Sequence, residues 1–295
     1  MKQTLLLLSV LFTSMIIAVP GCGRTLPPSS GVKVKNSAAT ADSLKSAFDL
    51  LRQATEVGHY REALHQMNAH LSKGTGKQVT PLTGEEKDAL GKLYGLNNGE
   101  MAELDASLFR PLDAFHLESC GLFRDAGRML EIANVPPLEQ ARICFDWVMR
   151  RVQLHQQGDP DLPPAFVLRR GYGNGLDRAL VFLALLRQFQ IEGCLLAPPD
   201  RPSDTSGPIL AGVLLVQDKN PTLALFDPRL GQPVPGPNQK GIATFAEARA
   251  NPELLKLSAM PADMVSKLEI YQFGPLEALS ARMRYLQIEL EFQDK

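Results

Sequence analysis

The sequence has few of the residues on which nucleic-acid and metal sites depend. Among 295 residues there are one Trp, five Tyr and five His, and 31 Lys and Arg face 32 Asp and Glu. A net charge of −1 provides no basic excess to neutralise phosphates, so we expect no nucleic-acid partner. His59, His65 and His70 are not spaced three or four residues apart, as one helix face would require. We therefore expect neither a metal nor another cofactor.

Cysteine is also scarce. The chain has Cys22, Cys120, Cys144 and Cys194, with no CxxC pair of the kind that binds zinc. Cys144 and Cys194 stand in apolar runs, which favours burial. Three cysteines follow Cys22, so an exported protein could form one disulfide among them, but the sequence does not determine its pairing.

After residue 22 no apolar run is long enough to span a membrane, but the N-terminus has one apolar run of its own. MKQTLLLLSVLFTSMIIAVPGC begins with a basic residue and continues with an apolar stretch, which predicts a secretory signal peptide over residues 1–21. Val19-Pro20-Gly21-Cys22 resembles the bacterial lipobox. The resemblance implies a lipid on Cys22 and an exported lipoprotein anchored on the periplasmic side of the cell envelope. A plain signal peptide or a short membrane anchor is the alternative.

The next part of the sequence predicts helices. Residues 22–41 are rich in Pro, Ser, Gly and Ala and predict a flexible tether. Residues 42–137 form the predicted helical region. Within it, residues 42–72 have two apolar stripes at helical spacing, which predict a hairpin with its turn at Gly58-His59-Tyr60. Thr83 precedes acidic residues and predicts the start of a capped helix.

A second helical stretch, over residues 99–134, is expected to break at Pro111. Beyond Pro136-Pro137 the pattern becomes mixed. The predicted elements are helices over 138–155 and 176–190 and strands over 194–197, 209–217 and 222–228. Residues 241–295 are expected to return to helix. The order predicts an α+β fold, with a helix packed on an antiparallel sheet over residues 138–240 and helical extensions on both sides.

The segment over about residues 138–232 resembles the transglutaminase-like domain of the papain-like fold. The residues that carry the resemblance are Trp147, Val148, a glycine-rich turn, then Asp177, Ala179, Leu185, Leu186 and Arg187 on an apolar helix, and Phe226-Asp227-Pro228 after a strand. The resemblance implies a Cys, His, Asp triad, with the Cys at the start of the apolar helix. There the helix dipole lowers the pKa of a thiol and makes it a nucleophile.

The triad-equivalent positions of this chain are Gly175, Ala211 and Asp227. The family pattern of Cys, any, Asp, any, Ala aligns with Asp177 and Ala179, which places Gly175 at the nucleophile position, while Gln190 replaces a later family glycine. The His position is Ala211 or one of its neighbours, Leu210 and Gly212.

Nothing nearby in the sequence replaces the two missing groups. The last histidine is His155, and Cys194 lies beyond the far end of the helix. Glycine has no side chain that could attack a substrate, so we expect the domain to be inactive. Asp227 precedes a proline and is expected to start a turn through its own side chain.

The glycines at 171, 173 and 175 have a phosphate-binding alternative, but Leu176 stands where the dinucleotide fingerprint needs glycine. A structural tight turn fits better. The leading hypothesis is a lipid-anchored envelope protein whose inactive domain binds a protein or peptide partner in its cleft, or acts as a scaffold. One alternative is an active, cysteine-independent hydrolase or transferase of peptide or amide bonds, with Asp177 and Asp227 as its acidic candidates. Another is a helical adaptor that uses residues 42–72 alone.

Overall fold

The computed structural model describes residues 38–54, 57–72, 79–155, 162–199, 208–217 and 220–293. The predicted signal peptide, Cys22 and most of the predicted tether lie outside this set. The described chain divides into two compact units. We call residues 38–122 and 274–293 the helical unit, and residues 123–273 the sheet unit. Among the described helices, none combines the length and the apolar character needed to cross a bilayer.

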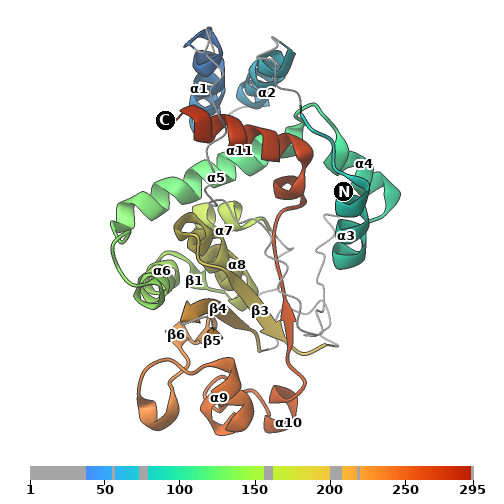
Figure 1. Cartoon of the computed structure of the whole chain (residues 1–295). Coiled ribbons are helices and arrows are strands. Elements are labelled where there is room, and N and C mark those ends of the chain that lie inside the picture. Colours follow the sequence, from blue (N-terminus) through green and yellow to red (C-terminus); the bar gives the residue numbers. More distant parts are fainter. Residues whose placement is uncertain are drawn as a thin grey trace. The chain divides into compact units, whose positions relative to one another are not determined.

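The helical unit is formed by six helices, one of which, α5, continues into the sheet unit (Figure 1). They are α1 (Ala38–Arg52), α2 (Val57–Ser72), α3 (Gly84–Tyr94), α4 (Asn98–Asp105), α5 (Pro111–Leu130) and α11 (Ala281–Gln293). The predicted hairpin of two helices is present, but two details were wrong. Helix α1 begins four residues before Asp42, in an alanine-rich run that favours helix. Gly58 lies inside α2, because the connection precedes it.

The apolar stripes of α1 and α2 are buried together with residues of two other elements. The cluster comprises Leu44, Ala47, Leu51, Ala63, Met67, Phe109, Ala114, Met283 and Leu286. Thr83 caps α3 as expected: its hydroxyl accepts a hydrogen bond from the Glu86 backbone, and Glu86 accepts one from the Thr83 backbone. Pro111 begins α5, where its missing N–H costs nothing.

The sheet unit is built on five antiparallel strands in the order β6-β5-β4-β3-β7. They are β3 (Gly193–Ala197), β4 (Leu210–Gln217), β5 (Asn220–Asp227), β6 (Gln232–Pro233) and β7 (Glu269–Tyr271). Two residues each of β1 (Gln153–Leu154) and β2 (Tyr172–Gly173) form a separate parallel pair. The remaining helices of the unit are α6 (Pro137–Arg151), α7 (Pro164–Arg170), α8 (Gly175–Leu186), α9 (Phe245–Ala250) and α10 (Ala262–Val265).

Helices α6 and α8 pack on one face of this sheet. Three aromatic rings join the layers: Phe145 of α6, Phe182 of α8 and Phe226 of β5 lie with centroids 5.0–5.3 Å apart. All three side chains are fully buried. The mixed helix-and-sheet fold, with an antiparallel sheet packed against a helix, is therefore as predicted.

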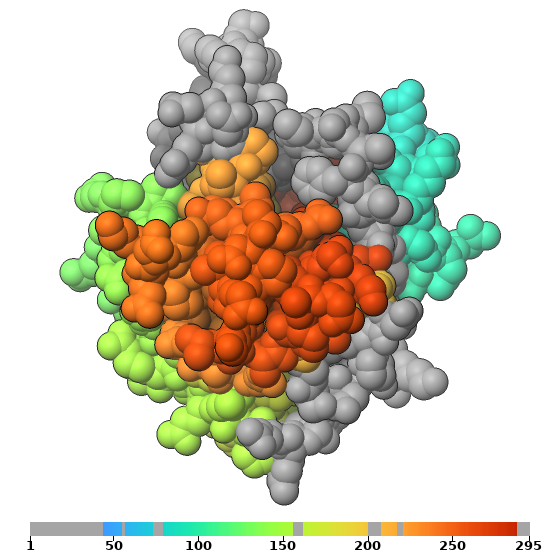
Figure 2. All heavy atoms as spheres, turned by 90° about the horizontal axis from the view of Figure 1, so that it is seen from below, coloured from blue at the N-terminus to red at the C-terminus, as the bar shows by residue number. Residues whose placement is uncertain are grey.

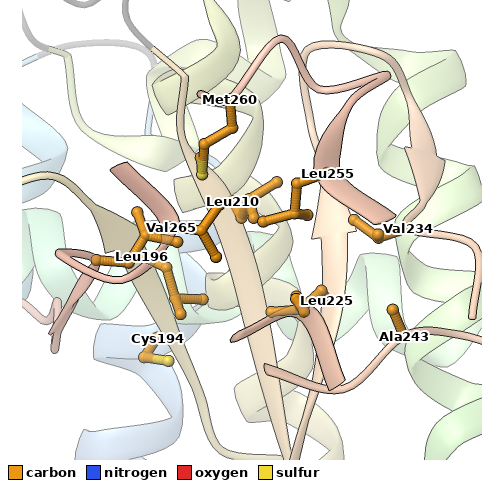
Figure 3. Close-up of a cluster of buried hydrophobic side chains, with 11 residues drawn as sticks. Cys194, Leu196, Leu210, Leu225, Val234, Ala243, Leu255, Met260 and Val265 are labelled. Carbon is orange, nitrogen blue, oxygen red and sulfur yellow. The ribbon is translucent and has the colours of Figure 1, made fainter. Parts of the chain in front are cut away.

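The segment that follows β6 covers the opposite face, with α9 and α10 below the strands in Figure 1. Orange atoms of this segment occupy the centre of the face seen in Figure 2. Figure 3 shows its apolar side chains meeting those of the strands. The buried cluster is Cys194, Leu196, Leu210, Leu225, Val234, Ala243, Ala248, Leu255, Met260, Val265 and Leu268.

One expectation for this part was wrong, one helix was not expected, and one expectation was right only in part. Helix α6 ends at Arg151 and the chain then enters strand β1, because the next residues bond to the backbone at Gly171 and Gly173. The seven-residue helix α7 was not predicted. The expected helical extension over residues 241–295 is present in part: it ends in the long helix α11, but the residues before α11 hold short helices and an edge strand, β7, which pairs with β3.

Candidate functional site

The start of α8 is fixed by Asn174 rather than by the glycines around it. Asn174 Oδ1 accepts a hydrogen bond from the Asp177 backbone N at 2.9 Å, and Asp177 Oδ2 accepts one from the Asn174 N at 3.0 Å. This capping box satisfies two N–H groups at the helix start. The sequence contains the signal for this cap, an Asn followed three residues later by an acidic residue, but no cap was predicted here.

Two of the three glycines around the start of α8 are constrained by their conformation or their neighbours. Gly171 ends α7 in the left-handed region at φ +77°. A Cβ on Gly173 would lie 2.6 Å from the Asp177 Cβ. Gly175 differs, because a Cβ there would meet only the Arg229 side chain and backbone, at 3.5 Å and beyond. The geometry therefore allows a side chain at the first position of α8, and glycine is not a structural necessity there.

Ala211 lies on the strand face that packs against the helices. It stands directly opposite Phe226 of β5, and directly opposed residues of antiparallel strands share a face. Its side chain is completely buried. Leu210, one of the two alternatives for the family's His position, belongs to the apolar cluster on the other face. Gly212 has no side chain, and a Cβ there would clash with Leu196 and Leu223.

Asp227 ends β5 and organises the turn that follows. Its Oδ1 accepts hydrogen bonds from the backbone N atoms of Arg229 and Leu230, both at 2.9 Å. The residue is 2% exposed. This is the side-chain turn expected of an Asp before Pro. The turn lies against the first residue of α8, since Arg229 is the neighbour that a side chain at Gly175 would touch.

Two arginines join the start of α8 to its surroundings. The Arg229 Nη2 donates to the Ser258 carbonyl at 2.8 Å, so its side chain runs from Gly175 to the segment covering the far face. Arg178 is buried one turn into α8, and its Nη2 donates to the Met149 carbonyl at 3.1 Å. Burial lowers the pKa of Arg178, and the charge of Asp227 partly opposes this. Sequence reasoning missed both arginines, because nothing local distinguishes a buried arginine from a solvated one.

Asp177, the acidic residue of α8, uses its carboxylate in a helix cap and an ion pair. Asp177 is 5% exposed and, besides its cap, forms an ion pair with Arg170 at 3.2 Å. The Arg170 guanidinium also lies 4.6 Å from the Tyr172 ring centroid. Asp177 therefore holds the turn between α7 and α8 in place.

The buried cysteines are far less reactive than an ordinary thiol. Burial raises the pKa of Cys144 and of Cys194 to about 12, so both stay protonated at neutral pH. Cys194 faces the apolar cluster on the side of the sheet away from α8 (Figure 3). No disulfide links the cysteines of the described residues.

The site thus combines a partly buried glycine beside Arg229, the buried methyl group of Ala211, and Asp227, whose carboxylate bonds to the following turn. No group of three or more His, Cys, Asp or Glu side chains within the described residues could hold a metal. Comparison of the chain with family models, curated proteins and solved structures finds no match.

Proposed function

We propose that this chain is a lipid-anchored protein of the bacterial cell envelope whose transglutaminase-like domain is catalytically inactive and serves in binding or scaffolding. The observation that carries the proposal is Gly175, at the first position of α8 and beside the turn after Asp227. A nucleophile in this family belongs at that position, and glycine supplies none.

The arrangement of the sheet unit supports the assignment to a papain-like core. Helix α8 packs on an antiparallel sheet whose central pair is the β4–β5 hairpin. Ala211 faces the helices, and Asp227 lies one residue beyond its partner on β5. This order, a helix start followed by two neighbouring strands, supports the proposed alignment of Gly175, Ala211 and Asp227 with the triad.

Loss of activity follows from the chemistry of the three residues. Gly175 and Ala211 can neither attack a carbonyl nor accept a proton. Asp227 has no imidazole to orient and uses its carboxylate in a turn. No observation favours the cysteine-independent enzyme, because its candidates, Asp177 and Asp227, are both buried and committed to structural hydrogen bonds.

If the protein is a helical adaptor, that function needs the whole helical unit and not residues 42–72 alone. The buried stripes of α1 and α2 pack also against Phe109, Ala114, Met283 and Leu286. A peptide of residues 42–72 would expose this apolar surface, and isolated helices of this length are marginal in water. We infer that any scaffolding surface needs α5 and α11 as well.

Activity and anchoring are tested separately. Purified protein incubated with a glutaminyl peptide and a primary amine should release no ammonia above the enzyme-free blank. Ammonia release that Asp177→Asn or Asp227→Asn abolishes in folded protein would overturn the proposal. Radiolabelled fatty acid should enter the chain in bacteria and be lost in Cys22→Ala. Labelling that persists in this variant would show that Cys22 is not the residue that carries the lipid.

A further inference from the structure

The β1–β2 pair of the sheet unit presents a face with aromatic and basic side chains. Gln153 of β1 stands opposite Tyr172 of β2, and alternate residues of a strand lie on the same face. His155 therefore shares the face of Gln153, and its ring centroid lies 5.5 Å from that of Tyr172. Tyr172 is 42% exposed. An aromatic ring is thus open to solvent three residues before Gly175, the first residue of α8.

Two arginines lie over aromatic rings at this place. The Arg170 guanidinium lies 4.6 Å from the Tyr172 ring centroid. The Arg151 guanidinium lies 5.6 Å from the ring centroid of Trp147, the only Trp of the chain. The two pairs are neighbours, because a Cβ on Gly171, between Arg170 and Tyr172, would lie 3.6 Å from the Arg151 carbonyl oxygen. The end of α6 and the start of β2 therefore contribute to one surface.

Helix α7 adds a second exposed ring next to Arg170. Phe166 is 54% exposed, and it lies on the same side of the helix as Arg170, four residues later. Arg150, next to Arg151 at the end of α6, is exposed as well. We call the following residues the arginine–aromatic surface: Trp147, Arg150, Arg151, Phe166, Arg170 and Tyr172.

This part of the chain is basic, although the whole chain has a net charge of −1. Residues 147–172 contain four arginines. The only acidic residues in the same stretch of sequence are Asp159 and Asp161, which lie outside the described residues. The stretch therefore keeps an excess of positive charge even when both aspartates are counted.

Arg150 and Arg151 carry the part of this charge that is not compensated. Arg170 forms an ion pair with Asp177 at 3.2 Å. Arg150 and Arg151 are both exposed, and neither forms an ion pair with another described residue. The C-terminal end of α6 stabilises their positive charges, and their guanidinium groups can reach an anionic partner.

We propose that the arginine–aromatic surface binds an acidic peptide segment of a partner protein. Arg150 and Arg151 donate to carboxylates of the segment, since a guanidinium matches a carboxylate with two parallel hydrogen bonds. The exposed rings of Phe166 and Tyr172 pack against its apolar carbons. Trp, Tyr and Arg are the residues that contribute most to binding at protein interfaces. This inference names the partner class for the binding role proposed above and rests on that role, but it needs neither the lipid anchor nor the loss of catalysis.

The test measures the fluorescence anisotropy of a labelled oligoglutamate peptide with the purified full chain in a neutral detergent. The chain should bind oligoglutamate but not oligoglutamine of the same length, and the affinity should fall as salt is added. Arg150→Ala/Arg151→Ala should weaken binding about tenfold. Arg150→Lys/Arg151→Lys keeps both charges and should weaken it less. Phe166→Ser, at an exposed position, should also weaken binding.

Arg124→Ala/Arg128→Ala is the matched control, because it removes the same charge from two exposed residues of α5 and should leave the affinity unchanged. A loss in this control as large as that in Arg150→Ala/Arg151→Ala would overturn the proposal, and so would the absence of oligoglutamate binding. Displacement of the peptide by equimolar inorganic phosphate or glycerol phosphate would also overturn it, since the surface would then be a site for a small anion or a lipid headgroup. Ammonia release bears on catalysis alone, so failure of this inference is distinguishable from failure of the proposed function.

Discussion

Arg282 of α11 and Asp113 of α5 form a buried, two-pronged ion pair although 169 residues separate them. The Arg282 Nε lies 2.5 Å from Asp113 Oδ2 and its Nη2 lies 2.9 Å from Oδ1. The side chains are 4% and 0% exposed. Arg282 Nη1 also donates to the Glu103 carbonyl at 2.6 Å, near the end of α4. One side chain therefore connects three helices of the helical unit.

Removing Arg282 should destabilise the helical unit strongly. Arg282→Ala takes the guanidinium away from the buried Asp113 carboxyl group and leaves it the Arg110 backbone N–H as a donor, so we expect a loss of about 3–5 kcal/mol. Urea unfolding followed by circular dichroism measures this loss. Arg142→Ala is the control, because its ion pair with Glu139 is exposed and should contribute little. Similar losses in the two variants would contradict the role given to Arg282.

Glu277, near the same ion pair, should make stability depend on pH. Burial, aided by the charge of Asp113, raises the pKa of Glu277 above its ordinary value of 4.5. The folded state therefore holds this proton more tightly than the unfolded state, and stability is lost as the pH rises from 4.5 through the raised value. Glu277→Gln removes that loss. Its stability relative to the native protein should increase between about pH 4 and about pH 7, and a constant difference would contradict the prediction.

Gly173 should tolerate no side chain. In Gly173→Ala the new methyl group would lie 2.6 Å from the Asp177 Cβ and displace the residue that caps α8. We expect a loss of about 1–3 kcal/mol, measured by urea unfolding. In Gly91→Ala, inside α3, the methyl group would meet only the Met101 Cε at 4.0 Å, and helix propensity predicts a gain of about 0.5–1 kcal/mol. An unchanged free energy of unfolding in Gly173→Ala would show that the turn can accommodate a methyl group.

The Asp227 side chain should stabilise the fold because it holds the turn that follows β5. Asp227→Ala removes the acceptor of two backbone hydrogen bonds and should cost about 2–4 kcal/mol. Asp227→Asn keeps an oxygen acceptor at the same place and should cost less than half as much. Equal stability of the Asp227→Ala variant and the native protein, in urea or thermal unfolding, would show that these bonds do not hold the turn.

Elements with strong local signals were predictable. The start of α3 is indicated by Thr83 and Glu86, and the start of α5 by Pro111. Each signal lies within one helical turn of the helix start. The β4–β5 hairpin followed from two apolar runs. Strand β7 was missed because its three residues are too short for an alternating pattern, and its partner β3 is far away in the chain.

The sequence predicted which positions of the candidate site lack a catalytic side chain, but it did not predict the contacts around them. The sequence is enough to show glycine at position 175 and alanine at position 211. It does not show that Arg229 extends from Gly175 to Ser258, or that Arg178 is buried. Such contacts depend on tertiary packing, since a charged side chain next to a turn is solvated in most proteins.

The central claim is that α8 begins at a nucleophile position that holds no nucleophile, and Gly175→Cys tests it most directly. The variant is made with Cys120→Ser, and the rate of alkylation by iodoacetamide at residue 175 is measured against pH in folded protein. The helix start and the nearby Arg229 should give the new thiol a pKa below the ordinary value of about 8.5 and rapid reaction at neutral pH. A thiol that reacts only above this pKa, or only after unfolding, would contradict the account.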